Sequence, residues 1–149
     1  MKKLLPLLWF GLALVLAHSV WAVGQATPDE AKAMAIKAAD YLKTNGGEKA
    51  FPEFDAANGP WRDSELYITV QDSKGVMVAN GGNPHLIGKN VLELKDPDGK
   101  PFNRDIQAIK DVGWVNFRWL NPVTKAMEAK TMYEIRVGEY IVGCGAYVQ

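Results

Sequence analysis

Cationic and aromatic side chains gather in the second half of the chain, in a pattern that could bind a small carboxylate. Arg118 lies between two aromatic residues, and Lys130 precedes another by three positions. A cation gives a carboxylate head charge-assisted hydrogen bonds, and aromatic walls give its tail apolar contact. The candidate side chains are Lys130, Tyr133, Trp119, Phe117, Arg118, Asn116 and Tyr67. A solvated strand face with ordinary lysines and arginines would show the same pattern, so these residues alone leave both interpretations open.

The stretch GGNPHLIGKN, residues 81–90, is rich in glycine and carries His85. It could hold a small molecule, or it could only turn the chain between two strand-like runs. Its glycines and its proline permit a tight path. We therefore predict that the loop is mainly architectural and covers the pocket side of a sheet, with His85 as a further candidate for ligand contact.

Metal and enzyme chemistry find little support in the sequence. One cysteine, Cys144, and one histidine beyond residue 22 cannot form a Cys/His metal cluster. Residues 96–100, DPDGK, begin like a calcium loop, but Lys100 stands where a ligand is required. No motif of a catalytic nucleophile is present to pair with His85, and the loop that carries His85 lacks the spacing of a phosphate-binding loop. We predict no catalytic residue, no metal and no cofactor, with Cys144 as a small buried filler.

One long helix and five strands are expected to position the candidate residues. The helix starts at Thr27, which can cap it, with Pro28 at the first helical position and Glu30 completing a capping box; NGG at residues 45–47 ends it. The strands are expected at residues 65–70, 75–80, 113–120, 127–137 and 140–148, with a short helix at about 101–110. Short connections between strands favour antiparallel pairs. The predicted fold class is α+β, a five-stranded antiparallel sheet with the long helix on one face and residues 81–110 on the other.

Alternation along the fourth expected strand, GWVNFRWL, separates the candidates by face. Trp114 points to one side, while Val115, Phe117 and Trp119 point to the other. Arg118 therefore lies opposite Trp119 unless a bulge intervenes, so these two side chains are not expected to line one pocket.

The beginning of the chain has the layout of a secretory signal. MKK is a short positive start, an apolar run follows, and VWA ends it with small residues at Val20 and Ala22. We predict a signal peptide at residues 1–22, cleaved after Ala22, and a periplasmic or secreted protein; an uncleaved anchor is the alternative. The formal net charge of +0 gives no basic excess for binding nucleic acid.

Four segments, in this order, resemble a known family, the single Cache domain, type 2. They are YITVQDSKGVMVANGGNPHLIGKNVLELKDPDGKPF, GWVNFRWLNP, KTMY and YIVGCGAYV, and the resemblance runs from about Glu65 to Val148. It implies one domain at residues 27–149, with a PAS-like antiparallel sheet, a long N-terminal helix behind it and a ligand pocket on the opposite face. It also implies extracytoplasmic sensing of small molecules, often short carboxylates, as in chemoreceptors and histidine kinases.

The resemblance also implies which residues form the site. The family's aromatic-x-Trp motif falls on Phe117 and Trp119, and its lysine before a tyrosine falls on Lys130 and Tyr133. Its proline-and-GKN loop falls on Pro84 and residues 88–90. Many relatives carry tyrosine where Phe117 stands, so this chain lacks a pocket hydroxyl.

The preferred hypothesis is an exported sensor module that binds a short carboxylate or a similar anionic metabolite, and that has no enzymatic activity. The chain ends at Gln149, directly after the last expected strand, so we expect it to act as a stand-alone module. The alternative is a protein-interaction module that partners a separate membrane receptor or histidine kinase without a ligand of its own.

Overall fold

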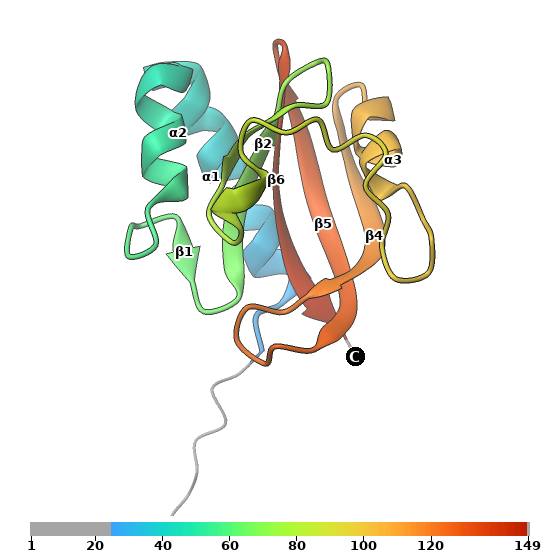
Figure 1. The fold of residues 1–149 in the computed structure, drawn as a ribbon. Coiled ribbons are helices and arrows are strands. Elements are labelled where there is room, and N and C mark those ends of the chain that lie inside the picture. Colours follow the sequence, from blue (N-terminus) through green and yellow to red (C-terminus); the bar gives the residue numbers. More distant parts are fainter. Residues whose placement is uncertain (1–24, 149) are drawn as a thin grey trace, which may run out of the picture.

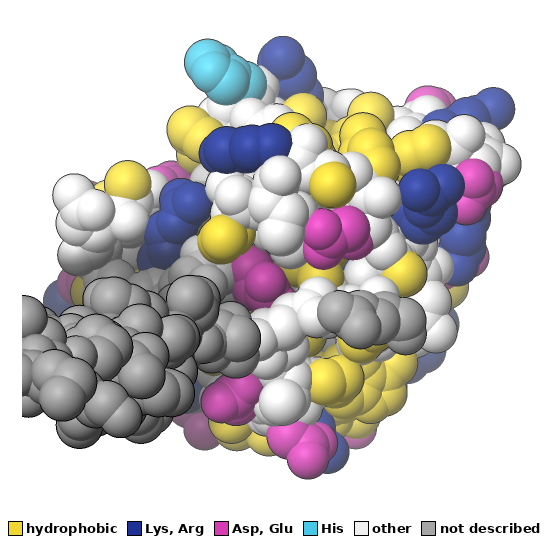
Figure 2. Space-filling view, turned by 90° about the horizontal axis from the view of Figure 1, so that it is seen from below, with side chains coloured by type: hydrophobic (Ala, Val, Ile, Leu, Met, Phe, Trp, Pro, Cys, Tyr) yellow, Lys and Arg dark blue, Asp and Glu magenta, His cyan; other side chains and the backbone are white. Residues whose placement is uncertain are grey.

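The computed structural model describes residues 25–148, and the expected leader at residues 1–22 lies outside them. A curved antiparallel sheet forms the middle of the molecule, with helices α1 and α2 on one side of it and helix α3 on the other (Figure 1). Within residues 25–148, no helix has the length and the apolar character needed to cross a membrane. Side chains of both charges are interspersed on the surface seen in Figure 2.

The elements follow the predicted order. The helices are α1 (Pro28–Asn45), α2 (Gly47–Asp55), the 3-10 turn η1 (Pro84–Leu86) and α3 (Phe102–Ala108). The strands are β1 (Arg62–Asp63), β2 (Leu66–Gln71), β3 (Met77–Asn80), β4 (Val112–Leu120), β5 (Met127–Val137) and β6 (Tyr140–Val148). The five predicted strands are confirmed, and β1 is a two-residue addition. Helix α2, with nine residues that include Phe51 and Phe54, follows α1 directly.

The sheet has the order β1-β2-β6-β5-β4, with β3 paired to β2 as well, and every pair is antiparallel. Its two central strands, β6 and β5, are joined by a tight turn in which Gly138 has a φ of 58°. The turn that leads into β3 likewise uses Gly75, with a φ of 77°. These glycines adopt a backbone conformation that side chains disfavour, which suits both tight turns.

Helix α1 covers one face of the sheet through small side chains. Its Thr27 and Glu30 form the predicted capping box, with both reciprocal hydrogen bonds present. The helix packs against β5 and β6, and its fully buried residues on this side are Ala31, Ala35, Ala38 and Ala39. Cys144 on β6 lies in the same core, where burial raises the pKa of its thiol to about 12. The thiol is therefore a packing group in this structure.

A second, smaller core lies on the opposite face, under α3. Phe102 and Ile106 of this helix pack against Val115, Phe117 and Met132 of the sheet. Asp96 fixes the segment that precedes α3, because its carboxylate accepts hydrogen bonds from the backbone N–H groups of Lys100 and of Arg118 on β4. The sheet is thus covered on both faces, which agrees with the presence of apolar side chains on both sides of its strands.

The close approach of α1 to the sheet can be tested by enlarging one alanine. Ala38→Leu inserts a larger side chain into a filled core, so we expect the free energy of unfolding to fall by about 1–3 kcal/mol. Ala33→Leu is the matched control, because Ala33 is exposed on the same helix. Urea unfolding of both variants measures the difference, and an equal effect at the two positions would contradict this packing.

Candidate ligand-binding site

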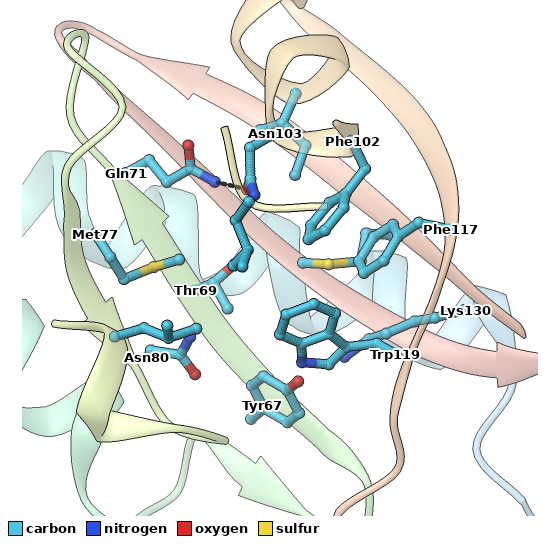
Figure 3. A pocket seen from close by; sticks show the side chains of 14 residues that line it. Tyr67, Thr69, Gln71, Met77, Asn80, Phe102, Asn103, Phe117, Trp119 and Lys130 are labelled. Carbon is cyan, nitrogen blue, oxygen red and sulfur yellow. Dashed lines mark hydrogen bonds between the residues drawn. The ribbon is translucent and has the colours of Figure 1, made fainter. Parts of the chain in front are cut away.

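A small cavity lies between the sheet and the segment that covers it. Its volume is about 30 Å³, roughly twice what one ordered water needs. Its walls come from β2, β4 and β5 on one side, and from the residues around β3, η1 and α3 on the other (Figure 3). The cavity is therefore formed between the two layers that the sequence predicted on this side of the sheet.

Strand alternation decides which sheet residues face the cavity. Strand β2 contributes Tyr67, Thr69 and Gln71, every second residue. Strand β4 contributes Phe117 and Trp119 in the same way, and β5 contributes Lys130 and Met132. Intervening residues such as Ile68 and Val70 pack into the core under α1 instead. The period of two thus places a cation, a phenol and two aromatic walls on one face.

Lys130 is the dominant charge of the cavity. Its side chain is only 1% exposed, and its ammonium lies 4.0 Å from the centre of the Tyr67 ring and 4.7 Å from that of Tyr147. Within residues 25–148, no carboxylate forms an ion pair with it. Aromatic faces compensate a buried ammonium only in part. The site can therefore accept an anion.

Two glycines on β6 make room for the long side chains of β5. Gly145 faces Met132 across the strand pair, and a Cβ atom there would lie 2.6 Å from Cε of Lys130. Gly143 faces Glu134, and a Cβ atom there would collide with the glutamate carboxyl group. The absence of side chains at both positions lets Lys130 and Glu134 lie across the middle of the sheet.

Glu134 is buried on the same face as Lys130. Burial raises the pKa of its carboxyl group to about 8, although the charges of Lys130 and Arg136 oppose this shift. One oxygen, Oε1, has no hydrogen-bond partner in the described chain. The carboxyl group is therefore protonated at neutral pH, and it does not neutralise Lys130.

The glycine pair at the start of the 81–90 loop supports Tyr67. A Cβ atom on Gly82 would collide with the Tyr67 ring, and one on Gly81 would lie 2.6 Å from the Phe54 carbonyl oxygen. The loop can pass this close only because both residues lack side chains. This supports the prediction that the loop is mainly architectural, since it holds an aromatic wall of the cavity.

The structure brings together four of the eight predicted site residues. Lys130, Tyr67, Phe117 and Trp119 all line the cavity. Phe117 stacks on Phe102 of α3 with ring centres 3.9 Å apart, which fixes its position. These four residues therefore remain the candidates for ligand contact.

The other four predicted residues do not line the cavity, which corrects the predicted site. Tyr133 points to the α1 side, where its ring lies 4.9 Å from that of Trp114, because its position on β5 has the parity opposite to Lys130. Arg118 and Asn116 are exposed and share the parity of Trp114 on β4. The Arg118 guanidinium donates to the Met127 carbonyl oxygen, and no bulge turns it inward.

His85 is the fourth of these residues. It lies on η1 with an exposed side chain, and histidine is seen on the outer surface in Figure 2. Its backbone N–H donates to the Asn83 side chain, which starts the 3-10 turn, and His85 is not among the described residues that line the cavity.

Several cavity residues were missed by the sequence interpretation. Thr69 and Gln71 could have been found, because they share the parity of Tyr67 on β2. Asn103 and the apolar side chains from the covering segment could not, since they reach the cavity only after that segment folds over the sheet. Asn80 reaches it from β3, whose pairing with β2 is irregular. No local pattern marks them.

An open groove adjoins the cavity. It has a volume of about 450 Å³ and is lined by residues that include Arg62, Lys125 and Met127. Tyr67 and Trp119 line both spaces. These two rings therefore separate the small cavity from the open surface.

The fold and the cavity together define a PAS-like sensor domain, and comparisons with known proteins identify its family. Residues 14–149 match the family described as Single Cache domain 2. The chain belongs to this family, as the motifs predicted. Single Cache domains are extracytoplasmic, ligand-binding sensory modules rather than enzymes.

The relatives are sensors of chemotaxis receptors. The methyl-accepting chemotaxis protein McpP of Pseudomonas putida is 31% identical over 91 residues, which are 58% of this chain and 17% of the receptor. The chain therefore spans only a small part of that receptor's length. A methyl-accepting chemotaxis protein of Vibrio parahaemolyticus shares the fold, with a TM-score of 0.70 and 22% identity over 81% of this chain and 88% of that one.

A second solved structure is described as "Structural basis for carboxylic acid recognition by a Cache chemosensory domain". It has a TM-score of 0.67 and 25% identity, over 81% of this chain and 92% of that one. A periplasmic sensor domain of a chemotaxis protein has a TM-score of 0.61 and 22% identity, over 81% of this chain and 90% of that one. The predicted fold class is confirmed by these structures.

The buried carboxyl group predicts a specific dependence of stability on pH. The folded-state pKa of Glu134, about 8, lies above its ordinary value of 4.5, so the unfolded chain releases this proton first as pH rises. The contribution of this group to the free energy of unfolding is fully present below about pH 4.5, and it is lost progressively as the pH rises to about 8. The free energy of unfolding of the unmodified protein, measured relative to that of Glu134→Gln, should therefore fall by roughly 3–5 kcal/mol as the pH rises across this window.

Urea unfolding at pH 5, 6.5, 8 and 9 measures this difference. The glutamine side chain has the shape of the protonated acid and fits above Gly143, so the variant is the control for all other titrating groups. If the two stability curves ran parallel between pH 5 and 8, Glu134 would be ionised in the folded protein.

Proposed function

We propose that this protein is an exported sensor domain that binds a short carboxylate outside the cytoplasm. The observation that carries the proposal is the buried Lys130 ammonium, which faces a small cavity and has no counter-charge within residues 25–148. A related Cache structure is described as recognising carboxylic acids, which supports this ligand class. The signal-like leader predicted at residues 1–22 supports a periplasmic or secreted location.

The cavity assigns each residue a role in this proposal. Lys130 gives the carboxylate a charge-assisted hydrogen bond, and Tyr67 lies beside it. Phe117 and Trp119 form the apolar wall against the ligand's carbon chain. The volume of about 30 Å³ restricts the ligand to a few carbon atoms. Phe117 lacks the hydroxyl that tyrosine would place here, so the polar contacts of the ligand come from other residues.

Removing the buried charge tests the proposal. With acetate or propionate at a hundredfold excess over Kd, binding should stabilise the native protein by about 2.7 kcal/mol. Lys130→Met keeps an unbranched side chain one atom shorter and removes the charge, so we expect this stabilisation to disappear in thermal-shift and calorimetric titrations. The variant itself should remain folded, since an unpaired buried charge is costly.

Arg118→Ala is the matched control, because it removes an exposed cation whose side chain points away from the cavity. It should leave the response to acetate and propionate unchanged. A response lost in Arg118→Ala but kept in Lys130→Met would contradict the proposed site, and no response in the unmodified protein would contradict the function.

A second candidate function is contact with a separate membrane receptor or kinase. Leu120 and Met127 are paired across β4 and β5, both are about half exposed, and both line the open groove. Apolar side chains beside a groove favour protein contact. Pull-down from envelope extracts should then recover a chemoreceptor or histidine kinase, and Met127→Lys should release it. A protein that is recovered alone, with a carboxylate response, would exclude this candidate.

A further inference from the structure

Three hydrogen-bonded side-chain amides, those of Gln107, Gln71 and Asn103, lead from the surface to the cavity. The donor and acceptor ends of each amide are fixed by the contact that Gln107 makes at the outer end. Nε2 of Gln107, on α3, donates to the Asp72 carbonyl oxygen at 3.0 Å and to Oε1 of Gln71 at 3.1 Å. Nε2 of Gln71 then donates to Oδ1 of Asn103 at 2.7 Å. A backbone carbonyl can only accept, so the Gln107 nitrogen must face Asp72.

This anchor settles which atom Asn103 turns to the cavity. Once the Gln107 nitrogen is fixed, the oxygen of Gln71 must face Gln107 and the oxygen of Asn103 must face Gln71. The atom left over is Nδ2 of Asn103, which is buried and has no hydrogen-bond partner within residues 25–148. The residue is 2% exposed and lines the cavity beside Gln71 and Phe102 (Figure 3). A buried N–H donor is thus left unpaired at the cavity.

A second amide has a similarly fixed orientation. Oδ1 of Asn80 accepts hydrogen bonds from the backbone N–H groups of Gly82 and Asn83, at 3.1 and 2.8 Å. The amide nitrogen of Asn80 is therefore the group that it can offer to the cavity, which it also lines. The Lys130 ammonium and the amide nitrogens of Asn103 and Asn80 thus form a polar wall of hydrogen-bond donors. No aspartate or glutamate is among the described residues that line the cavity.

We propose that this cavity selects short carboxylates that carry a second acceptor oxygen, namely hydroxy or oxo acids. The proposal rests on the function proposed above. Lys130 binds the carboxylate, and the second oxygen accepts from Nδ2 of Asn103. A plain alkyl acid leaves that donor unpaired, which a buried site penalises. An amino acid brings an ammonium group, which has only donors, to a wall of donors.

Calorimetric titration of the full chain with matched small acids tests this selection. The probes are propionate, lactate, 3-hydroxypropionate, pyruvate and alanine, which are close in size. We expect the best of the three oxygen-bearing acids to bind about tenfold more tightly than propionate, and alanine to bind more weakly than propionate. Equal affinities for propionate and all three oxygen-bearing acids would overturn the inference.

Variants separate the donor from the rest of the site. Asn103→Ala should reduce the tenfold preference for an oxygen-bearing acid over propionate to about one. Gln107→Leu lies outside the cavity and breaks the anchor of the amide chain, so it should lower the preference without loss of propionate binding. It keeps the inference testable if Asn103→Ala does not fold. A preference that survives in both variants would mean that the second oxygen does not meet Asn103.

The outcomes distinguish this inference from the function on which it rests. If propionate and the oxygen-bearing acids bind equally and all depend on Lys130, the carboxylate site stands and the role of Asn103 is wrong. If no acid binds, the proposed function itself is wrong. In a crystal with lactate, the ligand oxygen should lie within hydrogen-bond distance of Nδ2 of Asn103. An ordered water in that place, with lactate bound elsewhere in the cavity, would overturn the inference.

Discussion

The burial of the Lys130 ammonium is the interaction on which the site depends. A charge taken out of water is tolerated only where other groups replace its hydration, and here two aromatic faces do so in part. Glu134, an acidic group buried beside Lys130 on this face, holds its proton at neutral pH and does not compensate the positive charge. The fold thus retains an electrostatic cost that an anionic ligand would relieve. This is the physical basis of the proposed preference for carboxylates.

Space for this arrangement comes from residues that lack side chains. Gly143 and Gly145 leave the centre of β6 flat on one face, so the long side chains of β5 lie across it. On the other face of the same strand, Val142, Cys144 and Ala146 pack against the small residues of α1. One strand therefore supports a tightly packed core behind the sheet and the floor of a polar cavity in front. Hydrophobic packing on one side gives the rigidity with which charged groups are positioned on the other.

Much of the fold followed from local patterns. The capping box of α1 and the alternation within β4 both appear as the sequence indicated. Alternation also separated Trp119 from Arg118 correctly. The same rule applied to β5 separates Lys130 from Tyr133, which corrects the pairing taken from the family motif. Proximity in sequence indicated one site, but strand geometry placed the two side chains on opposite faces.

The sequence by itself determined the family, the order of the elements and the face on which each strand residue lies, because these depend on local spacing and on recognisable motifs. Only the tertiary structure decided that Asn80 and Asn103 reach the cavity, that Glu134 lies over Gly143, and that His85 does not line the cavity. Those outcomes depend on how the strands pair and on how residues 81–110 pack across the sheet, and both join positions apart in the chain. The orientation of a buried amide depends on its partners in space, and no local pattern encodes them.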